Sequence, residues 1–269
     1  MPTSGTQLAE NSLSIYQFYR TSLQALKDRG VPFLVGGAYA LERYTGIVRD
    51  TKDLDVFVKP EDAPRTLNIL AGKGFRTEMT FPHWLGKVFH DGAAVDVIFS
   101  SGNGLVRVDD AWFNTSYDAA ILDVQVRLCP PEDMIRSKCY IMERERYDGA
   151  DIAHLIFALA GSLDWRYLID RMGEHWRVLL SHLVLFGFIY PGERTRVPGW
   201  VMRELIDRLR DEEERSAPGT MLCQGTFLSR EQYLEDVQRR GFKDARLEPT
   251  GLMSEKEIEH WTAAINKIP

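Results

Sequence analysis

The hydrophobic pattern of this chain changes near residue 128, and the change divides the sequence into two parts. Before it, short apolar segments alternate with amphipathic segments and turn residues, a pattern that predicts both strands and helices. From Pro130 onward, apolar residues recur at helical spacing. With 269 residues the chain is long enough for two modest domains, which we expect at residues 1–128 and 129–269. The expected fold class is α+β, a mixed sheet with flanking helices followed by a helical C-terminal domain.

Turn and capping residues locate the elements more closely. In the first part we expect helices at residues 8–29, 38–44 and 64–72, and strands at 33–35, 54–58, 87–90, 93–99 and 124–128. Asp91-Gly92 is a strong hairpin signal, because both residues tolerate the positive φ angles of a two-residue turn. In the second part we expect helices at 133–146, 150–160, 164–189, 198–214 and 230–240.

Composition and charge argue against several classes of protein. The chain carries 33 basic and 39 acidic residues, whereas proteins that depend on phosphate contacts carry a basic excess. Its three cysteines, Cys129, Cys139 and Cys223, include no CxxC pair, so we expect neither a zinc finger nor a disulfide framework. The most apolar run, residues 178–190, is too short to span a bilayer, and the N-terminus lacks a signal-peptide pattern. We therefore expect a cytoplasmic protein with no membrane partner.

A diglycine and two acidic residues stand where a phosphate site and a metal site could form. Gly36-Gly37 lies between an expected strand and an expected helix, where glycines let the backbone approach a ligand closely. The helix N-terminus that follows supplies N–H groups and the positive end of the helix dipole, which together bind anions. Asp53 and Asp55 lie two residues apart in an extended segment, so their carboxylates share one face.

A third carboxylate is expected on a neighbouring strand. Asp96 lies between Val95 and Val97, alone on the polar face of an otherwise apolar strand. Carboxylates gathered on one face repel each other, and a divalent cation between them relieves the repulsion; hard oxygen ligands favour Mg²⁺. A phosphate cradle beside such a site predicts metal-assisted chemistry on a nucleotide phosphate.

The combination of Gly36-Gly37, Asp53-x-Asp55 and Asp96 resembles the DNA polymerase beta-like nucleotidyltransferase superfamily. It is similar in particular to the small bacterial branches, which include antibiotic nucleotidyltransferases and abortive-infection type toxins. The resemblance covers residues 33–155. The spacer of 15 residues before Asp53 is slightly longer than the commonest one in the family. Gly37 stands where the family often has Ser, so a hydroxyl contact to a terminal phosphate is missing.

This resemblance implies a nucleotidyltransferase-type sheet and a role for individual residues. Asp53, Asp55 and Asp96 would be the catalytic residues and the ligands of two Mg²⁺ ions. The NTP would be bound by the other motif residues: Gly36, Gly37, Arg49, Thr51, Lys52 and Lys138. Lys138 lies on the helix after the sheet, ahead of a turn of the form Arg146-x-Asp148-x-x-Asp151.

The implied reaction is the Mg²⁺-dependent transfer of an NMP from an NTP to a hydroxyl acceptor, with release of pyrophosphate. Asp96 would bind the second metal ion and act as general base. The acceptor stays open between a small molecule, tRNA and a protein. The alternative is a non-catalytic nucleotide-binding or toxin–antitoxin partner module of the same fold, for which a cognate antitoxin is a candidate partner.

Each of these residues also has a simpler structural explanation. Glycines are common in strand-to-helix turns, and acids are frequent on exposed strand faces. Lys138 can be a solvated helix residue, and Arg49 and Lys52 can be surface charges. Asp148 and Asp151 fit a helix N-cap and a first-turn acid. The combination of motifs, rather than any one of them, carries the prediction.

Overall fold

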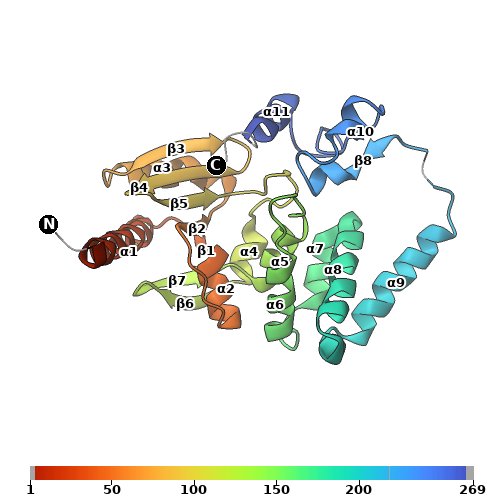
Figure 1. Cartoon of the computed structure of the whole chain (residues 1–269), viewed down its shortest axis with the longest axis horizontal. Coiled ribbons are helices and arrows are strands. Elements are labelled where there is room, and N and C mark those ends of the chain that lie inside the picture. Colours follow the sequence, from red (N-terminus) through yellow and green to blue (C-terminus); the bar gives the residue numbers. More distant parts are fainter. Residues whose placement is uncertain (1–3, 218, 265–269) are drawn as a thin grey trace. The chain divides into compact units, whose positions relative to one another are not determined.

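The computed structural model of the chain describes residues 4–217 and 219–264. The chain divides into two compact units, unit 1 (Met1–Pro130) and unit 2 (Pro131–Pro269). Unit 1 contains a large sheet with flanking helices, and unit 2 is mainly helical (Figure 1). Within the described residues, no helix is both long and apolar enough to cross a bilayer.

A seven-stranded mixed sheet forms the centre of unit 1, in the order β3-β4-β5-β2-β1-β7-β6. Its strands are β1 (Leu34–Val35), β2 (Asp53–Phe57), β3 (Arg76–Phe81), β4 (Leu85–His90), β5 (Ala93–Ile98), β6 (Tyr117–Ile121) and β7 (Val124–Leu128). The β2–β5 and β1–β7 pairs are parallel, and the other pairs are antiparallel.

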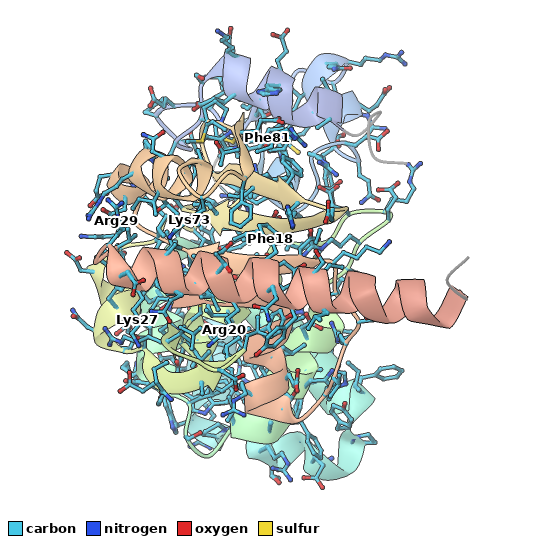
Figure 2. The ribbon with its side chains drawn as sticks, turned by 90° about the vertical axis from the view of Figure 1, so that its left-hand side faces the viewer. Phe18, Arg20, Lys27, Arg29, Lys73 and Phe81 are labelled. Atoms are coloured by element: carbon cyan, nitrogen blue, oxygen red, sulfur yellow. The ribbon has the colours of Figure 1, made fainter. Side chains whose placement is uncertain are left out.

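Four α-helices and a short 3-10 turn flank this sheet: α1 (Ser4–Asp28), α2 (Gly37–Thr45), η1 (Pro60–Asp62), α3 (Ala63–Ala71) and α4 (Asp110–Asn114). Leu67 of α3 lies against Gly86 of β4, where an added Cβ would come within 2.8 Å of it. Phe18 of α1 contacts the rings of Phe75 and His90, with centroids 4.8 and 5.3 Å away (Figure 2). These contacts attach both helices to the β3–β5 side of the sheet.

One face of the central strands is fully apolar. Leu54 and Val56 of β2 and Val95 and Val97 of β5 are completely buried. Because side chains alternate between the two faces of a strand, the residues between them project from the opposite face. The burial of these apolar residues therefore determines which side chains of β2 and β5 lie on the opposite face of the sheet.

The expected hairpin joins β4 and β5. Asp91 and Gly92 have φ angles of 46° and 81°, as a two-residue turn of this kind requires. His90 pairs with Ala93 directly beside the turn. This register determines which residues of β4 and β5 face each other farther along the hairpin.

Unit 2 is built mainly from helices. Its α-helices are α5 (Pro131–Cys139), α6 (Gly149–Leu159), α7 (Trp165–Met172), α8 (Trp176–Ile189), α9 (Gly199–Glu213), α10 (Leu234–Gln238) and α11 (Glu255–Ala263). Its 3-10 turns are η2 (Gly173–His175), η3 (Pro191–Arg196) and η4 (Gln224–Phe227). A small parallel sheet pairs β8 (Leu222–Cys223) with β9 (Lys243–Asp244).

Several element boundaries differ from the sequence-based expectation. The helix expected at 164–189 is two helices, because Gly173 takes a φ of 54° and ends α7. The second part was expected to be entirely helical, and the β8–β9 pair corrects this. The strand β3 was not expected, since only Phe81 of its side chains is buried and the strand shows no apolar alternation. The irregular stretch 102–125 contains α4 and β6.

Candidate functional site

Asp53 and Asp55 lie on β2 and project from the face opposite the apolar core. Exposure alternates along the strand: Leu54 and Val56 are buried, Asp53 is exposed and Asp55 is half-buried. The alternation follows from the pleat of a strand whose other face is covered. The structure therefore brings these two carboxylates to one face.

The register of the parallel β2–β5 pair brings Asp96 beside Asp55. The Cα atoms of Asp55 and Asp96 are direct partners, and Asp53 is paired with Ala94. Partners on neighbouring strands project to the same face, about 4.8 Å apart along the hydrogen-bonding direction. All three predicted acids thus share one face of two adjacent strands.

Lys87 of β4 lies on the other side of Asp96. It is paired with Asp96 in the antiparallel β4–β5 hairpin, and its Nζ donates hydrogen bonds to Oδ1 at 2.8 Å and to Oδ2 at 3.0 Å. The two side chains are 26% and 14% exposed. We call Asp53, Asp55 and Asp96 the carboxylate row; Lys87 lies beside it. The motifs did not indicate Lys87, although the hairpin signal could have placed it opposite Asp96.

The diglycine lies directly against Asp55. The Gly36 amide donates to the Asp55 carbonyl oxygen at 3.0 Å. Gly37 has a φ of 53°, in the left-handed region that favours glycine, and an added Cβ would lie 1.6 Å from Asp55 Oδ2. A serine at position 37 therefore has no room while Asp55 keeps its place. This close approach explains why position 37 holds glycine and not the serine that the resembled family often has there.

The N-terminus of α2 begins at this diglycine. Gly36 occupies the N-cap position and makes no side-chain capping bond, since glycine has no side chain. The first-turn amides of a helix have no acceptor within the helix, and they lie at the positive end of its dipole. An end of this kind, next to Asp55, can receive phosphate oxygens.

The loop before β2 contains Arg49, Thr51 and Lys52. Thr51 Oγ1 donates to the Asp53 carbonyl at 2.9 Å and accepts from the Asp53 amide at 3.2 Å, so it shapes the start of the strand. The Lys52 carbonyl accepts from the Ala94 amide at 3.0 Å. Arg49 and Lys52 are exposed. The loop therefore presents two cationic side chains close in sequence to Asp53.

Lys138 belongs to α5 of unit 2, where two acids hold its ammonium. Its Nζ lies 2.8 Å from Asp148 Oδ2 and 2.7 Å from Asp151 Oδ2, and all three side chains are at most 15% exposed. Arg146 Nε donates to the other oxygen of Asp148 at 2.9 Å. Burial alone would raise the pKa of Asp148, but Arg146 and Lys138 outweigh it and hold that pKa below its usual value.

Tyr19 of α1 is a polar residue near the row that the motifs did not indicate. It is 1% exposed, and its hydroxyl has no hydrogen-bond partner among the described residues. Burial raises the pKa of Tyr19 above its usual range, and the neighbouring Tyr39 and the three carboxylates raise it further. Tyr19 is therefore a neutral hydroxyl in the field of the row. In the sequence, Tyr19 lies within an apolar helical pattern, which gave no indication that it belongs to a site.

A separate hollow of about 690 Å³ lies along α3 and the end of α1. Its lining includes three cationic residues, Arg29, Arg65 and Lys73, and one acid, Glu61. Figure 2 shows Arg29 and Lys73 near the same end of α1. None of the row residues lines this hollow, so it is distinct from the candidate site.

The donors of the row fit a hard divalent cation. Carboxylate oxygens are the ligands that Mg²⁺ prefers. In the described part of the chain, no three His, Cys, Asp or Glu side chains already converge as an ion-binding group. Lys87 instead holds Asp96 with its ammonium, so one carboxylate of the row already binds a positive charge. The row can thus accept a cation on Asp53 and Asp55, with Asp96 next to them.

Three solved structures are among those similar to this chain. The antibiotic-resistance factor ANT(2'')-Ia is 16% identical, with 74% of this chain and 94% of that chain covered and a TM-score of 0.37. An antigenic nucleotidyltransferase-like protein from Paracoccidioides brasiliensis is 15% identical, covering 69% and 93%, with a TM-score of 0.46. The lincosamide antibiotic adenylyltransferase LnuA is 14% identical, covering 52% and 94%, with a TM-score of 0.39.

The assignment to a family rests on a different comparison. No curated protein matches the chain significantly. A family model described as "Uncharacterised nucleotidyltransferase" matches residues 3–185, which include the diglycine, the whole carboxylate row and Lys138. This match spans more than half of the 269 residues. The chain therefore belongs to this family of nucleotidyltransferases.

Proposed function

We propose that the chain transfers an NMP from an NTP to a hydroxyl acceptor and releases pyrophosphate. The observation that carries this proposal is the register that sets Asp55 opposite Asp96, with the Gly37 turn against Asp55. It combines acidic oxygens with a helix N-terminus, the two features that a metal–triphosphate complex needs. Membership of the nucleotidyltransferase family supports it.

The residues of unit 1 have distinct roles in this proposal. The first-turn amides of α2 bind phosphate oxygens, and the absence of side chains at Gly36 and Gly37 lets the triphosphate reach them. Bound Mg²⁺, held by oxygens of Asp53, Asp55 and Asp96, would supply charge neutralisation at the phosphates. Arg49 and Lys52 attract the nucleotide from the exposed loop.

The transfer itself exchanges one bond for another at the α-phosphorus. The acceptor oxygen forms a bond to the α-phosphorus while the bond from that phosphorus to the pyrophosphate oxygen breaks. The proton of the acceptor hydroxyl passes to Asp96, which Lys87 holds in place on the same face as Asp55. Asp53 and Asp55 would hold the Mg²⁺ whose charge offsets that of the triphosphate, so that the triphosphate can lie in line with the acceptor.

Labelled nucleotides test this reaction directly. The chain is incubated with Mg²⁺ and each NTP labelled at either the α or the γ position, with small hydroxyl compounds, tRNA or protein as acceptor. We expect label to reach an acceptor from the α position only, with equimolar pyrophosphate. Transfer of γ label would identify a kinase-like reaction instead. Nucleotide binding without any transfer would favour the non-catalytic module.

A matched pair of variants tests whether the transfer depends on the carboxylate row. Asp53→Asn removes one charge of the row and should slow transfer by about a thousandfold. Asp50→Asn makes the same change at an exposed residue of the loop before β2 and should leave the rate unchanged. The acceptor that gains mass in the wild-type reaction identifies the substrate class.

A further inference from the structure

The C-terminal end of α1 lies between two hollows of unit 1. The hollow of about 690 Å³ along α3 is lined by three cationic residues, Arg29, Arg65 and Lys73. A second hollow, of about 490 Å³, is lined by residues of α4, β6 and β7 and by two further cationic residues, Lys27 and Arg127. Because Lys27 and Arg29 are two positions apart at the end of a helix, they project to opposite sides of it. Figure 2 shows Lys27 on one side of α1, and Arg29 and Lys73 on the other. We call these five cationic residues the basic surface.

The charge of the basic surface is balanced only in part. Two acids, Glu61 and Asp118, line the two hollows. Three of the five cations donate hydrogen bonds to backbone carbonyl oxygens, which carry no net charge: Lys27, Arg65 and Arg127. Within residues 4–217 and 219–264, none of the five forms an ion pair with a carboxylate. The surface therefore keeps a local positive charge, although the whole chain has a net charge of −6.

An aromatic ring lies beside the cations of the second hollow. The lining there includes Phe113, which is half-buried, together with Pro32. Proteins that bind single-stranded nucleic acids combine cations for the phosphates with aromatic rings on which the bases stack. An acidic peptide would use the cations but not the ring. The combination therefore favours a nucleic-acid strand.

We propose that the basic surface binds a single-stranded nucleic acid, with phosphates at the cations of both hollows and a base on Phe113. Two hollows on opposite sides of one helix end suit an extended chain of phosphates rather than one compact anion. No residue of the carboxylate row lines either hollow, so this site is separate from the row. The inference goes beyond the proposed NMP transfer and does not require it.

A purely structural role of the cations predicts a different result. Arg29 and Lys73 follow the C-terminal ends of α1 and α3, where the helix dipole favours positive charge. If this were their whole role, neutral variants would be less stable but would bind nucleic acid like the wild type. In the part of the chain that the structure describes, neither side chain forms a hydrogen bond or an ion pair. Both charges can therefore be removed without breaking such a contact.

Fluorescence anisotropy with labelled oligonucleotides measures the binding without Mg²⁺, NTP or catalysis. The full chain is titrated against single-stranded RNA and DNA of the same mixed sequence at several NaCl concentrations. We expect Arg29→Gln/Lys73→Gln to bind at least about fivefold more weakly at low salt. The slope of log K against log salt should become smaller by about 1.4, since each phosphate contact of a single strand contributes about 0.7. The oligonucleotide that binds more tightly identifies RNA or DNA as the ligand.

Two controls separate this site from general electrostatics. Arg194→Gln/Lys243→Gln removes the same two kinds of charge from exposed positions of unit 2, and should keep the wild-type affinity and salt dependence. Phe113→Leu removes the ring and keeps an apolar side chain. It should weaken oligonucleotide binding about fivefold without changing the salt slope, and should leave the binding of labelled poly-glutamate unchanged. Thermal unfolding shows whether each variant folds, and the Arg29/Lys73 variant decides the proposal even if Phe113→Leu does not fold.

The outcomes that contradict the proposal are distinct. No binding of either oligonucleotide at low salt overturns it, as does equal affinity of the wild type and Arg29→Gln/Lys73→Gln. Poly-glutamate that displaces the oligonucleotide at the same concentration of charges would overturn the assignment to nucleic acid and favour an acidic protein. Weaker binding by the double variant supports the proposal whether or not NMP transfer is observed, so the two proposals can fail independently.

Discussion

Unit 1 and unit 2 each contain a lysine bonded to aspartate, but the two clusters are buried to different degrees. In unit 2, Lys138 and Arg146 face Asp148 and Asp151, two cations against two carboxylates at 2.7–2.9 Å. In unit 1, Lys87 is bonded to Asp96, and Asp53 and Asp55 lie on the same partly exposed face of the sheet. The motifs assigned Lys138 to the nucleotide site together with the carboxylate row, whereas Asp148 and Asp151 fitted a helix N-cap and a first-turn acid.

This difference indicates which cluster is complete without a ligand. A buried ion-pair group with balanced charge has its partners within the chain, and removing one partner leaves an uncompensated charge. The carboxylate row instead presents an exposed and a half-buried carboxylate on one strand face, where carboxylate oxygens can bind a cation. We therefore interpret the Lys138 cluster as structural and the carboxylate row as the reactive site.

The largest expected effect is the loss of transfer in Asp53→Asn. The variant removes a charge that the proposed reaction needs, and NMP transfer should slow by about a thousandfold, the scale of losing one preorganised electrostatic contact. Stability should not fall, since Asp53 is exposed and lies on the crowded acidic face. Transfer rates and thermal unfolding measure both. A wild-type rate in this variant would remove Asp53 from the site.

Lys138→Met should act on stability instead. It leaves Asp148 and Asp151 buried with one cation fewer, which should lower the free energy of unfolding by about 3 kcal/mol. The KM for NTP should stay close to the wild-type value. Denaturant unfolding and NTP kinetics separate the two effects. A raised KM with unchanged stability would restore Lys138 as a nucleotide contact.

The exposed pair of Arg177 and Glu212 provides the control for Lys138. Its side chains are 51% and 41% exposed. Removing the cation in Arg177→Met should cost less than about 1 kcal/mol, as is usual for surface pairs. Equal losses in the two variants would show that burial does not distinguish the Lys138 cluster.

Gly37→Ala should have a smaller effect on stability and a clear effect on transfer. The substituted residue has a φ of 53°, and its Cβ would overlap Asp55 Oδ2. We expect a loss of about 1–3 kcal/mol from the strained backbone, together with slower transfer because Asp55 must move. Gly46→Ala at the other end of α2 has a φ of 74° but no atom within 4 Å, so it should lose stability without losing specific activity. Similar activity losses in both variants would disprove the role of the close approach.

The smallest expected effect is an acid-dependent loss of stability in unit 2. Because the pKa of Asp148 is lower in the folded chain than in the unfolded chain, its contribution is fully present above the unfolded pKa of about 4. This contribution is lost as the pH falls through the folded pKa. Denaturant unfolding between pH 5 and pH 2 should show a weaker pH dependence for Asp148→Asn than for the wild type. An identical pH dependence would contradict this assignment.

Much of the fold could be predicted because local patterns and the structure agree. The positive-φ turn at Asp91-Gly92 and the apolar alternation around Asp53 both appear as expected. The strand β3 could not be predicted, since its exposed edge shows no apolar pattern. The helix break at Gly173 was missed because apolar spacing continues on both sides of it.

The site could be predicted in part. Asp53 and Asp55 share a face because of their spacing, whereas the pairing of Asp55 with Asp96 depends on a register between strands distant in sequence. Lys87 could have been found, since it lies four residues before the Asp91-Gly92 turn and Asp96 lies four residues after it. Tyr19 could not, because only packing of α1 brings its hydroxyl near the row.

The most direct test of the central claim is a crystal structure of the chain with Mn²⁺ and a non-hydrolysable NTP, using the anomalous signal of manganese. We predict an anomalous peak at the oxygens of Asp53 and Asp55, with the triphosphate at the N-terminus of α2. Manganese and nucleotide bound together at another place, with the carboxylate row unchanged, would contradict the account.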